Sequence, residues 1–150
     1  MEVIPVLHNV SSVQRVNDMA RLVYSLGYET LVVTKAYGGA AQAGIPEAMR
    51  IALREGKRLI VLPDLQDAIE LLSPEKILLV SRDYMEEEYD PYNPPRYEGR
   101  LLIVFQGSEP DFTAKEARLG TPVYLKGVTR GRLGPLAEAS IILYSLRGRD

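Results

Sequence analysis

The chain has 150 residues, a formal net charge of −2, no cysteine and one histidine, His8. This length suits one domain with its own hydrophobic core, so we expect a single domain over residues 1–150. The lack of cysteine excludes disulfides and thiolate zinc sites, and a single histidine excludes a histidine-rich metal site, so no metal site is predicted.

The first ten residues, MEVIPVLHNV, have neither the basic start nor the long apolar stretch of a secretory signal. No run approaches the ~20 apolar residues that span a bilayer. We therefore expect a cytoplasmic protein without a membrane partner. Scarce Asn and Gln with plentiful Arg, Glu and Pro favour a thermophilic source.

Short apolar runs rich in Val, Ile and Leu alternate with helical patterns along the chain. Strands are predicted over residues 2–10, 30–35, 58–63, 76–81, 100–107 and 122–127. Helices are predicted over residues 13–26, 45–55, 65–72 and 112–120, and from Pro135 onward. The first helix opens with a capping box in SSVQ, in which Ser11 pairs with Gln14.

Two connecting segments interrupt this alternation. The small-residue stretch AYGGAAQAG, residues 36–44, is predicted to be a loop. Residues 84–98 are rich in acids, Pro and Tyr and are predicted to be a long surface loop inserted in the domain. The basic residues gather instead in KGVTRGR, residues 126–132, which could give a locally positive surface or only dispersed, solubilising charge.

The strands are apolar at nearly every position, which indicates burial on both faces. The sequence therefore predicts an α/β fold with a mostly parallel six-stranded sheet and helices on both faces. In such sheets ligands bind at the carboxyl ends of strands. Three of these ends carry polar or glycine-rich segments, namely HNVSSVQR, FQGSEPD and LKGVTRGRLG. Each also fits a plain structural role, as a helix cap, a tight turn or a charged surface loop.

The closing helix is apolar over most of its circumference. Such a helix must be buried on several sides. It therefore either inserts into the core or covers a second subunit.

Taken together, these segments resemble the SPOUT class of RNA methyltransferases. HNVSSVQR resembles the family's first motif, IVFQGSEP its second, and VYLKG with IILYS the two ends of its third. The resemblance implies a deep C-terminal trefoil knot, bound S-adenosylmethionine, a tRNA or rRNA substrate, and a homodimer through the C-terminal helix.

The resemblance also implies site residues. Arg15 would be catalytic and would contact RNA. The cofactor-binding residues would be Phe105, Gly107, Ser108, Glu109, Leu125, Gly127, Val128 and Leu133. The RNA-binding residues would be Asn9, Arg15, Lys126, Arg130 and Arg132.

Three alternatives remain. The family's Ser-Leu-Asn is replaced by Arg132-Leu133-Gly134, which favours a SPOUT-like dimer that binds cofactor or RNA without methyl transfer. A metal-dependent nuclease could use the acids of PDLQDAIE, which are Asp64, Asp67 and Glu70. The Glu55-Gly56-Lys57 segment, however, precedes Pro63-Asp64, the reverse of the usual nuclease order. A flavodoxin-like nucleotide binder would have an unknotted terminal helix.

Overall fold

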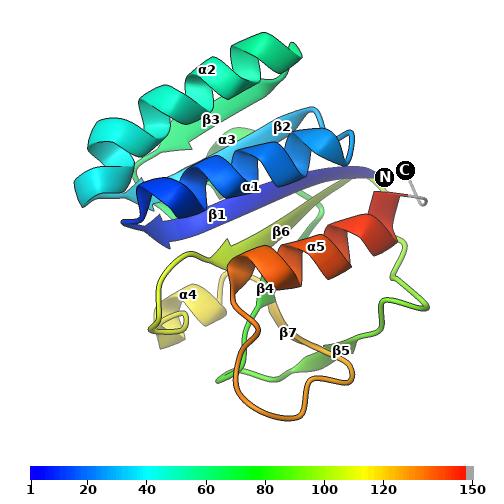
Figure 1. Cartoon of the computed structure of the whole chain (residues 1–150). Helices are drawn as coiled ribbons and strands as arrows, with labels where there is room; N and C mark the ends of the chain where they lie inside the picture. The colour runs from blue at the N-terminus through cyan, green and yellow to red at the C-terminus, as the bar shows by residue number, and fades with distance from the viewer. Residues whose placement is uncertain (148–150) are drawn as a thin grey trace.

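The computed structural model describes residues 1–147 and is built around one parallel sheet (Figure 1). Its strands are β1 Glu2–Val10, β2 Thr30–Ala36, β3 Arg58–Leu62, β4 Lys76–Val80, β5 Glu87–Tyr89, β6 Arg100–Gln106 and β7 Thr121–Leu125. Their order across the sheet is β3-β2-β1-β6-β4-β7-β5. All six neighbouring pairs run parallel, which confirms the predicted sheet type.

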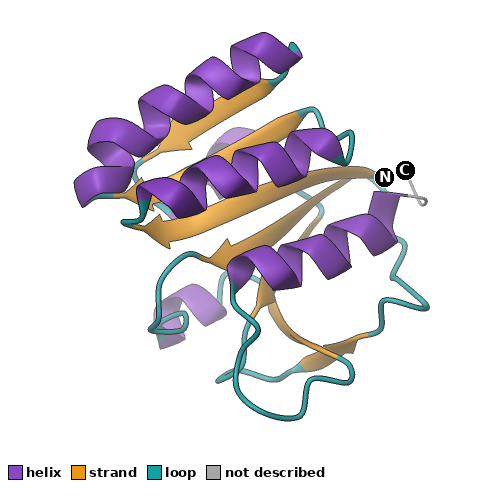
Figure 2. Cartoon of the chain, viewed as in Figure 1, coloured by secondary structure: helices purple, strands orange, loops and turns teal. Residues whose placement is uncertain are grey.

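Helices cover both faces of the sheet, as the apolar strands predicted (Figure 2). The helices are α1 Val13–Ser25, α2 Ile45–Glu55, α3 Leu65–Leu72, α4 Ala114–Ala117 and α5 Pro135–Leu146, with a π-helix, η1, at Ala40–Gly44. In Figure 1, α1, α2 and α5 lie in front of the sheet, and α3 and α4 lie behind it. Two apolar clusters fill the space between the sheet and these two helical layers.

The sheet has seven strands, so the prediction of six is wrong. The additional strand, β5, lies inside the 84–98 segment that was predicted to be a loop throughout. It pairs with β7, with Glu87 opposite Val123 and Tyr89 opposite Leu125. Tyr89 is 2% exposed, because it points into the core while its acidic neighbours face outward. One inward side chain in a charged run gives too weak an alternation to predict a strand.

Three local predictions are also corrected. The N-cap of α1 is Ser12, whose hydroxyl accepts from the Arg15 amide, whereas Gln14 donates to Asp18. The 36–44 segment is partly helical, since η1 runs directly into α2. The fourth predicted helix is reduced to one turn, capped by Thr113.

The closing helix, α5, packs beside α1 over the front of the sheet. Ala139, Ile142, Leu143 and Leu146 are fully buried. The Tyr28 hydroxyl donates to the Leu143 carbonyl at 2.6 Å. Ile141 and Tyr144 remain 37% and 60% exposed, so one side of the helix faces outward. The trefoil knot stays a prediction. Within residues 1–147, no helix is both long and apolar enough to cross a membrane.

Candidate functional site

A row of buried polar side chains crosses the back of the sheet near its carboxyl edge. Thr34 on β2, His8 on β1 and Gln106 on β6 lie side by side in the strand register. Ser81, directly after β4, continues the row. All four are 2% exposed or less. Since buried polar groups destabilise a fold unless they find partners, a row of them beside an apolar core points to a site.

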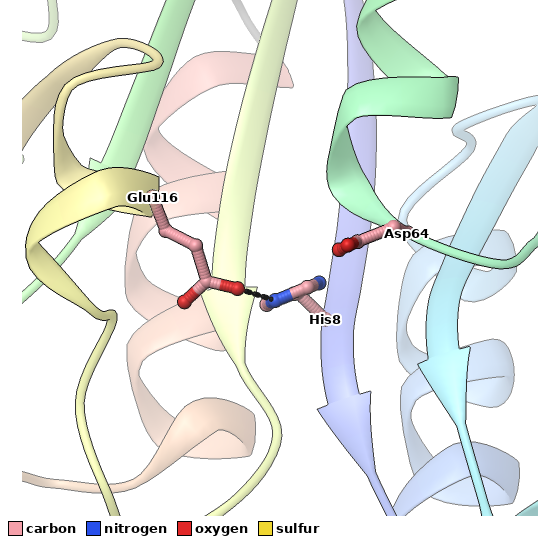
Figure 3. Close-up of side chains that lie close together, drawn as sticks. All are labelled: His8, Asp64 and Glu116. Atoms are coloured by element: carbon pink, nitrogen blue, oxygen red, sulfur yellow. Dashed lines mark hydrogen bonds and ion pairs between the residues drawn. The ribbon is translucent and has the colours of Figure 1, made fainter.

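His8 is held at both ring nitrogens. Its Nδ1 lies 2.8 Å from the Thr34 hydroxyl, and its Nε2 lies 2.5 Å from Glu116 Oε2. The ring also stacks on Phe112, with 6.1 Å between centroids. Figure 3 shows Glu116 reaching His8 from α4.

Glu116 is positioned by the start of its own helix. Its Oε1 accepts from the Thr113 amide at 2.9 Å, and the Thr113 hydroxyl accepts from the Glu116 amide at 3.1 Å. This capping box leaves Oε2 turned toward His8. A helix of one turn therefore places a carboxylate accurately, because the cap fixes the side chain as well as the backbone.

Asp64 completes the group from the opposite side (Figure 3). It follows β3, is the N-cap of α3, and accepts from the Leu65 amide at 2.7 Å. Asp67 accepts from the Asp64 amide in return. The ligand atoms of His8, Asp64 and Glu116 all lie within 4.8 Å of one another. We call these three residues the His8 group.

The charge state of Glu116 suits this arrangement. Burial acts to raise the pKa of the carboxyl. Hydrogen bonds from the Thr113 amide and His8, together with the charges of His8 and Lys35, outweigh burial and hold the pKa below its usual range. Glu116 is therefore ionised at neutral pH.

The donor set of the His8 group fits a divalent metal ion. An imidazole nitrogen with two carboxylate oxygens suits first-row ions such as Mn²⁺ or Zn²⁺. Asp64 is exposed, so an ion can reach the group from solvent, whereas His8 and Glu116 are fixed from within. Beside them, the buried Gln106 Nε2 has no hydrogen-bond partner among the described residues, so a donor is available for an anion or water.

Two of the three arginines predicted to contact RNA, Arg15 and Arg132, bind backbone at the end of β6. Arg15 Nη1 donates to the Gly107 carbonyl at 2.6 Å. Arg132 donates to the carbonyls of Gln106 and Ser108 at 3.3 and 3.2 Å. The Ser108 hydroxyl donates to the Asn9 carbonyl at 2.6 Å. These contacts tie the first and third predicted motifs to the second.

The residues predicted to bind cofactor or RNA lie in different surroundings. Leu125, Gly127 and Val128, with Lys126, line a cavity of about 1190 Å³ on the α5 side of the sheet. Leu133 and Arg15 line a separate hollow of about 370 Å³. The remaining predicted residues line neither: Phe105 and Gly107 are buried, Ser108 is half-buried, and Glu109 and Arg130 are exposed.

With this geometry established, comparison with known proteins identifies the family. A model described as "RecB-family nuclease (DUF2122)" matches residues 38–145, a range that contains Asp64 and Glu116. The chain belongs to this family.

Two curated relatives agree with the family. "Putative type II restriction enzyme ApeKORF2002P" from Aeropyrum pernix is 60% identical over 146 residues, covering 97% of this chain and 93% of the relative. "Putative type II restriction enzyme MjaORF1200P" from Methanocaldococcus jannaschii is 34% identical over 140 residues, covering 93% and 92%.

Solved structures share the fold of this chain. "Probable Methyltransferase from Bordetella pertussis Tohama I" aligns with a TM-score of 0.70 and 16% identity over 99% of this chain and 95% of its own. The SpoU methyltransferase AviRb from Streptomyces viridochromogenes, in complex with AdoMet, aligns with a TM-score of 0.73 and 11% identity over 97% and 56%. The predicted SPOUT resemblance is thus confirmed for the fold.

The prediction of an RNA methyltransferase is wrong, because the family and both curated relatives indicate a nuclease. The resemblance followed loops and a terminal helix, which belong to the scaffold, and a scaffold does not determine chemistry. Sequence reasoning also missed the His8 group. Pro63-Asp64 was the available signal, and it was set aside because the order of the other nuclease residues was reversed.

Proposed function

We propose that this protein hydrolyses phosphodiester bonds of nucleic acid with a divalent metal ion held by His8, Asp64 and Glu116. The observation that carries the proposal is the convergence of an imidazole and two carboxylates at the carboxyl edge of the sheet, in a chain that belongs to a nuclease family. A bound divalent ion would polarise the scissile phosphate and lower the pKa of an attacking water.

Thr34 gives His8 the freedom that metal binding requires. To bind an ion through Nε2, neutral histidine must carry its proton on Nδ1. A hydroxyl can donate or accept, so Thr34 can pair with Nδ1 in either tautomer. The ring therefore keeps its position whether Nε2 faces the Glu116 carboxylate or an ion.

The substrate proposal starts from double-stranded DNA, because the curated relatives are named as restriction enzymes. RNA is the parallel substrate to assay, since the scaffold is shared with RNA methyltransferases. The test incubates the protein with each polymer in Mn²⁺, in Mg²⁺ and in excess EDTA, and follows chain cleavage.

Asp64→Asn is the variant that tests the metal site most directly. Asp64 is exposed, and the side-chain oxygen of asparagine can still accept the hydrogen bond that caps α3. Glu70→Gln, which removes an exposed acid from the same helix, is the matched control. We expect cleavage and Mn²⁺ binding by calorimetry to be lost in Asp64→Asn and kept in Glu70→Gln. Equal cleavage by the wild type and Asp64→Asn, or equal cleavage in EDTA, would refute the proposal.

A second candidate function is supported by the cavity on the α5 side. We infer that it binds S-adenosylmethionine as a ligand, since a structural neighbour is solved with AdoMet and Leu125, Gly127 and Val128 line this cavity. Calorimetry with S-adenosylmethionine tests this. Val128→Trp would fill the cavity and abolish binding, whereas Leu133→Ala, in the separate hollow, would not. No heat of binding to the wild type would end this candidate.

We also propose that the exposed side of α5 joins two copies of the chain, since Ile141 and Tyr144 are apolar surface there. Light scattering should then give a dimer mass for the wild type and a monomer mass for Tyr144→Asp. Lys126 and Arg130, both exposed in the segment between β7 and α5, are the proposed nucleic-acid contacts. A monomeric wild type at micromolar concentration would contradict the proposed dimer.

A further inference from the structure

Two residues beside the His8 group have an unusual backbone conformation. Asn9 and Lys35 have φ of 62° and 53°, and the only other non-glycine residue with positive φ in the described chain is Ser73. Ser73 is explained by its place as the C-cap of α3. Asn9 and Lys35 lie within strands, where this conformation is rare.

The two positions face each other across β1 and β2. His8 pairs with Thr34 before them, and Val10 pairs with Ala36 after them. Neighbouring parallel strands therefore kink at the same level, one residue beyond the buried polar row. Because both strands bend at the same level, the bend belongs to this edge of the sheet and not to a single residue.

The kink changes where Lys35 points. Side chains alternate between the faces of a regular strand, so the residue after Thr34 would face the front layer of helices, as Val33 does. Lys35 is instead exposed. It directly follows Thr34, whose hydroxyl lies 2.8 Å from His8 Nδ1. The backbone of Lys35 therefore adjoins the His8 group at the carboxyl edge of the sheet.

Lysine is a poor choice for such a conformation, which glycine and asparagine adopt more readily. The chain does use glycine at other positive-φ positions, such as Gly38 three residues later. The Lys35 ammonium makes no hydrogen bond or ion pair with any residue of the described range 1–147, so no structural contact accounts for it. Strained positions of this kind cluster at functional sites.

We propose that the paired kink of β1 and β2 holds Lys35 so that its ammonium contacts a phosphate of nucleic acid beside the His8 group. This inference rests on the proposed function for the nature of the ligand. It requires neither a bound metal nor cleavage. In this proposal the strained backbone of Lys35 serves to position the substrate, and Asn9 makes the matching bend in β1.

The test measures binding of a fluorescent DNA duplex by anisotropy, in EDTA, over a range of salt concentrations. Each lost phosphate contact reduces the slope of log affinity against log salt by about 0.9. We expect this reduction, with weaker binding at low salt, in Lys35→Asn, and recovery of the slope in Lys35→Arg. Asparagine accepts the left-handed conformation, so the melting temperature should stay the same or rise by about 2 °C.

Two control variants separate charge from conformation. Lys57→Asn removes a positive charge just before β3, at the opposite edge of the sheet, and should leave the slope unchanged. Ser73→Asn alters the other left-handed position and should affect only melting. An unchanged slope in Lys35→Asn would overturn the inference. A lower melting temperature with an unchanged slope would assign Lys35 a structural role instead.

The inference and the proposed function can fail separately. If Lys35→Asn shows the expected reduction in the salt slope but the wild type neither binds Mn²⁺ nor cleaves nucleic acid, the nuclease proposal is rejected and the phosphate contact stands. Metal-dependent cleavage with an unchanged slope in Lys35→Asn would do the reverse. A wild type that binds no nucleic acid would overturn both.

Discussion

Replacing Glu116 with glutamine tests the His8 group most directly, because it removes a charge and nearly preserves shape. The carboxylate accepts from His8 at 2.5 Å and from the Thr113 amide at 2.9 Å. Glutamine has one acceptor oxygen and no charge, so its oxygen can accept at the helix cap or from His8 but not at both, and neither bond keeps the carboxylate's charge.

The expected loss of stability follows from these two contacts. Hydrogen bonds to charged groups contribute about 1.5–3 kcal/mol, against about 0.5–1.5 kcal/mol for neutral ones. The exchange of a charged for a neutral acceptor, in a side chain 15% exposed, therefore destabilises by about 1 kcal/mol. For a chain of this length the melting temperature should fall by about 2–4 °C.

The loss should depend on pH. The folded-state pKa of Glu116 is held below its usual range, so its stabilisation is present above the unfolded pKa and disappears as pH falls through the folded pKa. Thermal melts of both proteins should differ at about pH 7 and converge in acid. Mn²⁺ should raise the melting temperature of the wild type and not of the variant.

Two results would refute this reasoning. One is an identical melting temperature for both proteins at neutral pH. The other is a Mn²⁺-induced rise of the same size in both. Glu70→Gln, an exposed change of the same chemistry, is the control for a general effect of charge.

Three further changes test the packing that supports the site. Gly107→Ala would place a Cβ 2.8 Å from Val10 Cβ and 3.0 Å from two backbone oxygens, so overpacking should destabilise by about 1–3 kcal/mol in denaturant titration; an unchanged midpoint would contradict this close contact. Tyr28→Phe should lower the free energy of unfolding by about 1–3 kcal/mol, because the Leu143 carbonyl loses a buried donor, and a neutral result would mean that water replaces the hydroxyl. Leu143→Ala should lower the free energy of unfolding by about 2–5 kcal/mol, because it leaves a cavity in the core. Ile141→Ala, on the exposed side of α5, should lower it far less. Equal losses in the two variants would contradict the burial of Leu143 and the exposure of Ile141.

Local chemistry made much of the scaffold predictable. The apolar runs VIPVL in β1 and LLIVF in β6 predicted burial on both faces, and therefore a parallel sheet between two helical layers. The helical patterns of the chain predicted α3 at Leu65–Leu72 and the start of α5 near Pro135. β5 was missed because each of its residues pairs with a residue of β7 that lies 36 positions later in the chain, as Glu87 does with Val123, and only that pairing makes three residues a strand.

The candidate site depends on tertiary structure to a greater degree. In the sequence, His8 was a lone histidine, Asp64 an acid before a short helix, and Glu116 a helix residue. Glu116 lies 108 residues from His8. No spacing rule joins such residues, and the reversed order of Pro63-Asp64 and Glu55-Gly56-Lys57 argued against a nuclease.

By itself, then, the sequence determined the alternation of strands and helices and the burial of both sheet faces, since these follow from the side chains of neighbouring residues. The tertiary structure decided which polar residues meet. Parallel strands end at one edge, so the ends of β1, β2 and β3 and the short helix after β6 converge there, however far apart they lie in the chain. The left-handed bend at Lys35 likewise became visible only once β1 and β2 were paired.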